Sequence, residues 1–201
     1  MTGSAAGAHD LDLYDVAYLA GGPARVVDTA LVALVRAGKL RIHSPGQLAT
    51  ADLTRRHPVE AAVLDAVGPT GHRSVDTIRW RLTDDDRLLA VGRRLRSAGL
   101  IGRVGALFLR SLRPPAPTRA GRRVLRRLGD ETGWADAEVA RVALGGRAAM
   151  TDTRLRTEVF EQSSTALVPG RRSRSVDHSD PRLRAYRPGG PRSRAGAHAL
   201  F

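Results

Sequence analysis

The sequence predicts a mainly α-helical fold with small two-stranded β wings, followed by a disordered basic tail. One pattern occurs twice: an apolar-periodic helix ends at a glycine and passes into a short strand, over residues 26–42 and again over residues 86–103. A hydrophobic content of 42% is enough for a modest core in a chain of 201 residues. After residue 151, Arg, Ser, Pro and Gly prevail and apolar clusters are sparse, which is typical of disorder.

In the first copy, apolar residues at helical spacing predict a helix that starts near Asp12 and ends at Gly21-Gly22-Pro23. The proline suits the first turn of a second helix, over 24–37, and Gly38 suits its left-handed C-terminal cap. Strands are then expected over 39–42 and 47–50, joined by a turn.

In the second copy, Pro58 opens a helix that Gly68 ends, and Ser74 caps a short helix carrying Val75, Ile78, Trp80 and Leu82. Thr83 is expected to cap the next helix, and Gly99 to end it. Residues 100–104 and 106–112 then alternate like a pair of strands around Gly105.

Beyond the second copy, the proline-rich residues 114–117 predict a rigid connector to a helix over 118–128. That helix should turn Val124, Leu125 and Leu128 inward and its arginines outward. One more helix is expected over 138–144. The residues assigned a purely structural role are Gly21, Gly22, Pro23, Gly38 and Gly99.

Five segments follow from these boundaries. They are a disordered N-terminus (1–10), a first module (11–57), a second and basic module (58–128), a partly helical segment (129–150) and a tail predicted to be disordered (151–201).

Residues 58–128 resemble winged-helix domains of the MarR-type regulators. The resemblance rests on residues 94–101 (RLRSAGLI) and 118–125 (TRAGRRVL), which match the end of the recognition helix and the start of the helix after the wing. Together with the helix–glycine–strand pattern that occurs twice, it predicts two tandem winged-helix-like modules. It says little about function, because these motifs are mostly structural.

Residues 11–66 are similar to a family of uncharacterised actinobacterial proteins, many of them membrane-anchored. The matching stretches are residues 18–23 (YLAGGP), 25–31 (RVVDTAL) and 57–63 (HPVEAAV). This family has no established activity, so the resemblance implies none for this chain. No spanning segment or signal peptide is predicted in this chain, so we expect a cytoplasmic protein.

The two copies of the pattern differ in net charge. The chain carries a formal net charge of +13, and residues 58–128 hold fifteen basic against six acidic side chains, whereas residues 10–57 are nearly neutral. Lys39 is the single lysine. A GC-rich coding bias explains the choice of arginine, and explains the surplus of positive charge less well. The surplus of positive charge is therefore compatible with an anionic partner such as nucleic acid or acidic lipid.

DNA binding by the second module is one hypothesis, because basic side chains on a recognition helix and its flanks can read bases and hold phosphates. Its candidate residues are Arg87, Arg93, Arg94 and Arg96 in the helix, Arg103 and Arg110 in the wing, and Arg119, Arg122 and Arg123 after it. Asp84, Asp85 and Asp86 at the helix N-terminus argue against it, because they would repel phosphate.

Two other interpretations stay open. A winged-helix scaffold used for protein contact or self-association predicts a non-enzymatic interaction or regulatory protein, and we favour this role. Binding to an anionic membrane surface through the basic helix at 118–128 is less favoured. The chain has no cysteine and no nucleotide-binding glycine motif, and its six histidines lack metal-ligand spacing. The sequence thus predicts no catalytic residue, metal, cofactor or small-molecule ligand.

Overall fold

The computed structural model describes residues 11–102, 116–129 and 134–161. Within these ranges the chain is mainly helical with one small antiparallel sheet, as predicted. The predicted wing strands, 100–104 and 106–112, lie outside the described residues from residue 103 on, as does the tail beyond residue 161. The predicted boundary between residues 57 and 58 falls inside one compact unit that runs to Ser163.

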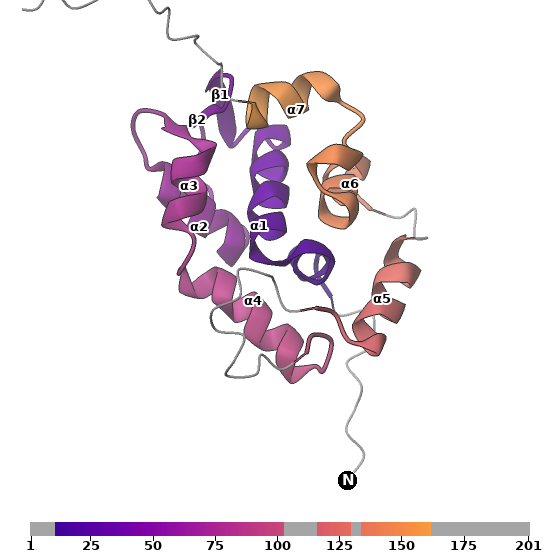
Figure 1. Ribbon diagram of the computed structural model, residues 1–201. Coiled ribbons are helices and arrows are strands. Elements are labelled where there is room, and N and C mark those ends of the chain that lie inside the picture. Colours follow the sequence, from indigo (N-terminus) through magenta and orange to yellow (C-terminus); the bar gives the residue numbers. More distant parts are fainter. Residues whose placement is uncertain (1–10, 103–115, 130–133, 162–201) are drawn as a thin grey trace, which may run out of the picture. The chain divides into compact units, whose positions relative to one another are not determined.

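The longest helix, α1 (Leu13–Arg36), lies between α2–α4 on one side and α5–α6 on the other (Figure 1). Asp12 caps this helix. The Asp15 carboxylate accepts a hydrogen bond from the Asp12 backbone N–H, which completes a capping box. The predicted break at Gly21-Gly22-Pro23 is a kink inside this helix, because Gly22 adopts φ 71° while the flanking turns stay helical. Only glycine takes this conformation without strain.

The repeated cap is confirmed at both positions. Gly38 has φ 70° and Gly99 has φ 69°. In each copy, the next residue donates its backbone N–H to a carbonyl five residues back: Lys39 to Leu34, and Leu100 to Leu95. A Cβ on either glycine would meet no atom within 4 Å, so the positive φ, and not a lack of space, calls for glycine here.

After the first cap, β1 (Leu40–Ser44) and β2 (Gln47–Thr50) form the predicted hairpin. The sheet continues with β3 (Arg73–Ser74), which pairs with β2 and comes from the second copy. Among the described residues after the second cap, Ile101 forms a single antiparallel bridge with Pro117. The two copies therefore share a sheet.

The second copy supplies three helices: α2 (Pro58–Val67), α3 (Val75–Arg81) and α4 (Asp86–Ser97). Ser74 caps α3 as predicted, by accepting a bond from the Thr77 N–H. The prediction that Thr83 caps α4 is wrong. The last turn of α3 continues to Thr83, whose N–H donates to the Trp80 carbonyl, so Asp85 becomes the cap.

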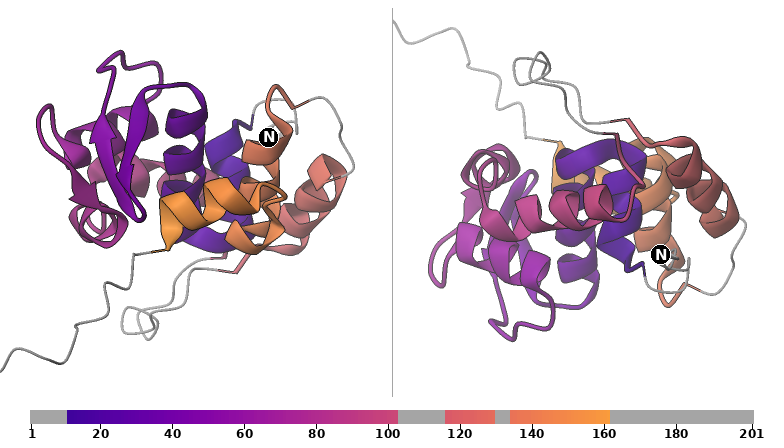
Figure 2. Two further views of the ribbon diagram at one scale, coloured as in Figure 1. Left: turned by 90° about the horizontal axis from the view of Figure 1, so that it is seen from above. Right: turned by 90° about the horizontal axis from the view of Figure 1, so that it is seen from below.

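Three further helices follow: α5 (Arg119–Gly129), α6 (Ala137–Gly145) and α7 (Thr153–Phe160), with a short 3-10 turn, η3 (Arg147–Ala149), between the last two. Helix α7 corrects the prediction that disorder begins at residue 151. It forms because Asp152 caps it and because Val159 is fully buried in the core. Figure 2 shows α7 beside α6 and α1.

One hydrophobic cluster joins both copies. Leu31 and Leu34 of α1, Val63 of α2, Ile78 of α3 and Leu95 of α4 all belong to it and are fully buried. A smaller cluster packs Val32 of α1 against α6. Neither copy keeps a separate core, because both turn their apolar faces toward α1.

Candidate functional site

The arginines of α4 were the main candidates for reading DNA, and two of them, Arg87 and Arg94, are paired with carboxylates of the same molecule. The Nη2 of Arg94 lies 2.6 Å from Asp15 Oδ1 and 2.9 Å from Asp12 Oδ2, both at the start of α1. Arg87 contacts Asp65 of α2 at 2.7 Å and its own helix cap, Asp85, at 2.8 Å. Four carboxylates thus neutralise two guanidinium groups at this face.

The other two candidates on α4 differ from each other. Arg93 is exposed, donates to the Asp86 carbonyl and lies 3.9 Å from the Asp86 carboxylate. Arg96 is half-buried, and its Nε is fully buried without a hydrogen-bond partner among the described residues. Arg103 and Arg110 lie outside the described residues.

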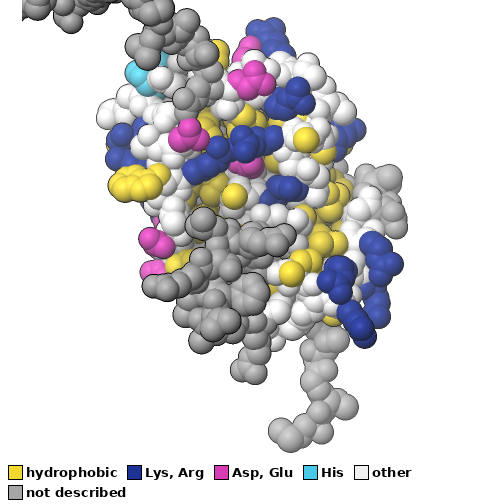
Figure 3. All heavy atoms as spheres, in the orientation of Figure 1, with side chains coloured by type: hydrophobic (Ala, Val, Ile, Leu, Met, Phe, Trp, Pro, Cys, Tyr) yellow, Lys and Arg dark blue, Asp and Glu magenta, His cyan; other side chains and the backbone are white. Residues whose placement is uncertain are grey.

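The arginines of α5 have a different environment. Arg119, Arg122 and Arg123 are exposed, and no carboxylate of the described residues lies within ion-pair distance of them. Arg126 and Arg127 extend the exposed row along the helix. Figure 3 shows basic side chains gathered over α5. Thr118 fixes the start of the helix, because its Oγ1 accepts the Gly121 N–H at 3.1 Å.

The inner face of α5 is packed as predicted. Leu128 is buried, and Val124 and Leu125 contact the main core. Gly121 faces the chain just after the Gly99 cap, where an added Cβ would lie 2.2 Å from the Leu100 carbonyl oxygen. The close approach of this backbone fixes which side of α5 faces outward.

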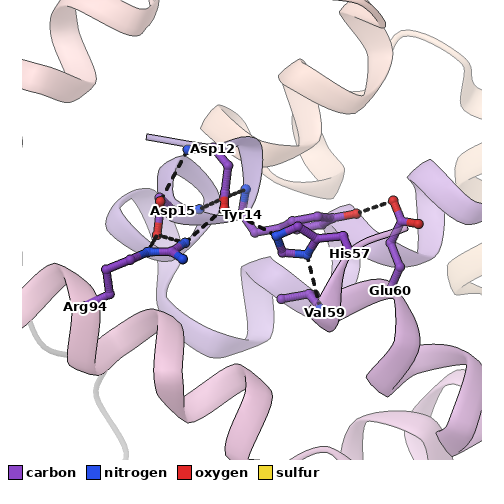
Figure 4. Close-up of polar contacts among 7 residues, drawn as sticks. All are labelled: Asp12, Tyr14, Asp15, His57, Val59, Glu60 and Arg94. Carbon is purple, nitrogen blue, oxygen red and sulfur yellow. Dashed lines mark hydrogen bonds and ion pairs between the residues drawn. The ribbon is translucent and has the colours of Figure 1, made fainter. Parts of the chain in front are cut away.

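A network of polar side chains, which the sequence did not predict, joins α1 to α2 (Figure 4). His57 precedes α2 and lies against Tyr14 of α1, with ring centroids 4.5 Å apart and ring planes tilted by 36°. The Tyr14 hydroxyl donates to Glu60 Oε1 at 3.1 Å, and Lys39 Nζ donates to Glu60 Oε2 at 2.9 Å. Asp12 links this network to Arg94. These partners are too far apart in sequence to form a recognisable motif.

Both ring nitrogens of His57 are occupied. Its Nδ1 accepts the Val59 N–H at 3.1 Å, so Nδ1 carries no proton. Its Nε2 therefore carries the proton and faces Asp12 Oδ2 at 3.3 Å. A histidine and an aspartate in contact are also found in catalytic sites, but a general base needs a free lone pair. Here the pair caps two helices.

Burial and charge shift three pKa values in this network. Burial opposes ionisation of Asp12, but hydrogen bonds from His57 and the Asp15 backbone, together with the Arg94 charge, lower its pKa to about 2. Burial raises the pKa of Asp15, with Arg94 acting in the opposite direction. Burial and the neighbouring Glu60 carboxylate raise the pKa of Tyr14, so its hydroxyl stays a hydrogen-bond donor.

Within the described ranges, no three His, Asp or Glu side chains are grouped so that they could hold a metal ion. By length and mean hydropathy, α1 could cross a membrane, which the separate helices predicted from sequence did not suggest. In this structure α1 is a core helix that buries Asp15 and Asp28.

Comparison with known proteins adds no relative: no protein family, curated protein or solved structure matches the chain.

Proposed function

We propose that this protein is a non-enzymatic interaction protein that binds a polyanion through the exposed face of α5. The observation that carries the proposal is the contrast between two arginine-rich helices. Arg87 and Arg94 on α4 are neutralised by carboxylates of the same molecule. Arg119, Arg122 and Arg123 on α5 meet no carboxylate of the described residues and stay available to an external anion.

Duplex nucleic acid fits this face better than a lipid surface. The guanidinium fork binds phosphate oxygens in pairs, and a helix that rises about 1.5 Å per residue spreads residues 119–127 over about 12 Å of backbone. A helix on a membrane needs apolar side chains to insert. In the described part of the chain the exposed large hydrophobic residues are Leu53, Trp80 and Leu89, and none of them belongs to α5.

The proposed binding is independent of base sequence. Base readout needs side chains that enter a groove, and two of the four α4 arginines, Arg87 and Arg94, are held by Asp12, Asp15, Asp65 and Asp85. Asp84 and Asp86 add negative charge beside the start of α4. Phosphate contacts position a protein on a duplex without reading its sequence.

The test is binding of the full-length protein to short random-sequence duplex DNA at low salt. Replacing Arg119, Arg122 and Arg123 together by glutamine should abolish detectable binding. A matched control replaces Arg41, Arg56 and Arg154, which are exposed elsewhere, and so removes the same charge. If both triple variants weaken binding equally, general charge and not α5 holds the DNA.

Salt dependence gives a second readout. Each single replacement, Arg119→Gln, Arg122→Gln or Arg123→Gln, removes one phosphate contact and should reduce the slope of log K against log salt by about 0.9. Sedimentation with vesicles rich in phosphatidylserine is the competing assay. Binding to these vesicles without binding to duplex DNA would overturn the proposal.

A further inference from the structure

Arginines from three separate elements gather around one buried carboxylate, Asp28 of α1. Arg79 of α3 donates to Asp28 Oδ1 from two nitrogens, of which Nε lies at 3.2 Å. The Nε of Arg147, in η3, lies 3.1 Å from Asp28 Oδ2. Arg25 lies on α1 one turn before Asp28, and the charges of Asp28 and Arg147 both act on it. In Figure 3, basic side chains cross the middle of the visible face, over α1.

This cluster carries more positive than negative charge. Asp28 supplies a single carboxylate to the guanidinium groups around it. Asp76 lies 3.3 Å from Arg79 Nη1, but its side chain is 66% exposed, so solvent screens much of its charge. In the described part of the chain, these are the carboxylates within ion-pair distance of Arg25, Arg79 and Arg147. A surplus of positive charge therefore remains on this face.

The fold holds the Arg25 guanidinium in this cluster against repulsion. Burial, together with the like charge of Arg147, lowers the pKa of Arg25, although the Asp28 carboxylate acts in the opposite direction. An added Cβ on Gly21 would lie 2.9 Å from Arg25 Nε, and one on Gly146 would lie 2.8 Å from Arg25 Cζ. The two glycines thus leave the space that this guanidinium fills.

Several N–H donors of the cluster have no acceptor among the described residues. Arg25 donates from Nη1 to the Ala143 carbonyl over a long 3.4 Å, and its Nε and Nη2 donate to no group of the described chain. Arg147 reaches Asp28 through Nε, which leaves both terminal nitrogens without a partner in the described ranges. The Arg147 side chain is 46% exposed, so a ligand can approach it.

The Phe160 ring of α7 holds two of the guanidinium groups in place. Its centroid lies 5.1 Å from Arg147 Cζ and 5.7 Å from Arg79 Cζ. The face of an aromatic ring attracts cations, so both side chains are ordered before a ligand arrives. Donors that are already ordered lose less conformational entropy when they bind.

We propose that Arg25, Arg79 and Arg147 form a binding site for the phosphate group of a phosphomonoester. Such a group carries a charge of about −1.5 to −2 at pH 7 and three strong acceptor oxygens, which suit the surplus charge and the unused donors. Guanidinium groups bind phosphate oxygens in pairs. The site contains no residue of α5, so it does not depend on the function proposed for that helix.

The experiment is calorimetric titration of the full-length protein with methyl phosphate and with dimethyl phosphate, which differ by one charge. Methyl phosphate should bind saturably and about tenfold tighter than the diester, because the second charge is lost. Free O-phosphoserine and a phosphoserine peptide carry the same group, and their relative affinities distinguish a small molecule from a modified protein as its source. Absence of saturable methyl phosphate binding, or equal affinities for the monoester and the diester, would overturn the proposal.

Variants locate the site, with circular dichroism as the check that each one folds. Arg147→Gln and Arg25→Gln each remove one guanidinium and should weaken methyl phosphate binding about tenfold. Arg41→Gln and Arg122→Gln, at exposed positions of β1 and α5, remove the same charge and should change the affinity less than about twofold. Asp76→Asn removes an opposing carboxylate and should tighten binding about twofold, a gain that unfolding cannot produce. Equal losses in the cluster and control variants would refute the site.

Discussion

Arg94 of α4 holds Asp15 of α1 through two N–H groups that converge on one carboxylate oxygen, from Nη2 at 2.6 Å and from Nε at 3.1 Å. The Asp15 side chain is 1% exposed, so this guanidinium is its main counter-charge. Arg94 also reaches Asp12, the cap of α1. A residue that the sequence offered as a DNA contact thus joins helices from the two copies.

Replacing Arg94 by alanine should destabilise the protein by about 2 kcal/mol, because Asp15 would stay buried without its partner. Chemical denaturation measures the change. Arg93→Ala, one residue earlier on the same helix and exposed, is the control and should cost less than about 0.5 kcal/mol. Adding Asp15→Asn to Arg94→Ala should recover part of the loss. Equal stability of the Arg94 and Arg93 variants would contradict the role of the pair.

Acid should weaken the fold in part through Asp12. Its pKa falls from the ordinary 3.8 to about 2 in the folded protein. A depressed carboxyl pKa adds stability that is complete above about pH 4 and is lost as the pH falls toward 2. Because the Asp12 side chain is 37% exposed, we expect a contribution of only about 1 kcal/mol.

Unfolding free energies measured at pH 6 and near pH 2.5 check this expectation. Asp12→Asn keeps a good helix cap and should reduce the difference between the two pH values. Asp84→Asn, at an exposed position outside the network, should keep the full difference. The assignment fails if the two variants respond to pH alike.

Gly121→Ala should cost about 1–3 kcal/mol, although alanine favours helices over glycine. The added methyl group would meet the Leu100 carbonyl at 2.2 Å, and backbone cannot move aside cheaply. Gly129→Ala at the end of the same helix meets no atom within 4 Å and is the matched control. Thermal unfolding compares the two. A neutral Gly121→Ala would mean that α5 does not pack against this backbone.

Phe160→Ala should lower stability by about 2 kcal/mol. The ring contacts both core clusters and lies under two guanidinium groups, with Arg147 at 5.1 Å and Arg79 at 5.7 Å from its centroid. Both arginines pair with the buried Asp28. Thr157→Ala, at an exposed position of α7, is the comparison. If both variants unfold at the same denaturant concentration, α7 does not stabilise the core.

Local signals in the sequence predicted many of the elements. Gly38 and Gly99 ended their helices because a positive φ requires glycine, and Ser74 capped α3 because its hydroxyl reaches a free N–H. These interactions span at most five residues and can be read in a single chain. The prediction failed at residues 151–160, where a capped but polar segment folds because α7 contacts the core.

The pairing of the arginines was equally beyond prediction from local sequence. Counting charges identified residues 58–128 as basic, but could not tell which arginines face a carboxylate. Arg94 meets Asp12 and Asp15 from 82 and 79 positions away, whereas Arg119, Arg122 and Arg123 of α5 meet no carboxylate of the described chain.

The sequence by itself determined the helical segments before residue 151, the glycine caps at Gly38 and Gly99, the first hairpin and the surplus of positive charge, because each depends on neighbours along the chain. Only the tertiary structure decided that the two copies share a core and a sheet, and that the ring nitrogens of His57 and the Tyr14 hydroxyl are occupied by hydrogen bonds. It also decided that Arg87 and Arg94 of α4 are neutralised, while Arg119, Arg122 and Arg123 of α5 meet no carboxylate of the described residues. The physical reason is distance: burial and ion pairing depend on which residues meet in space, and those residues lie far apart in the chain.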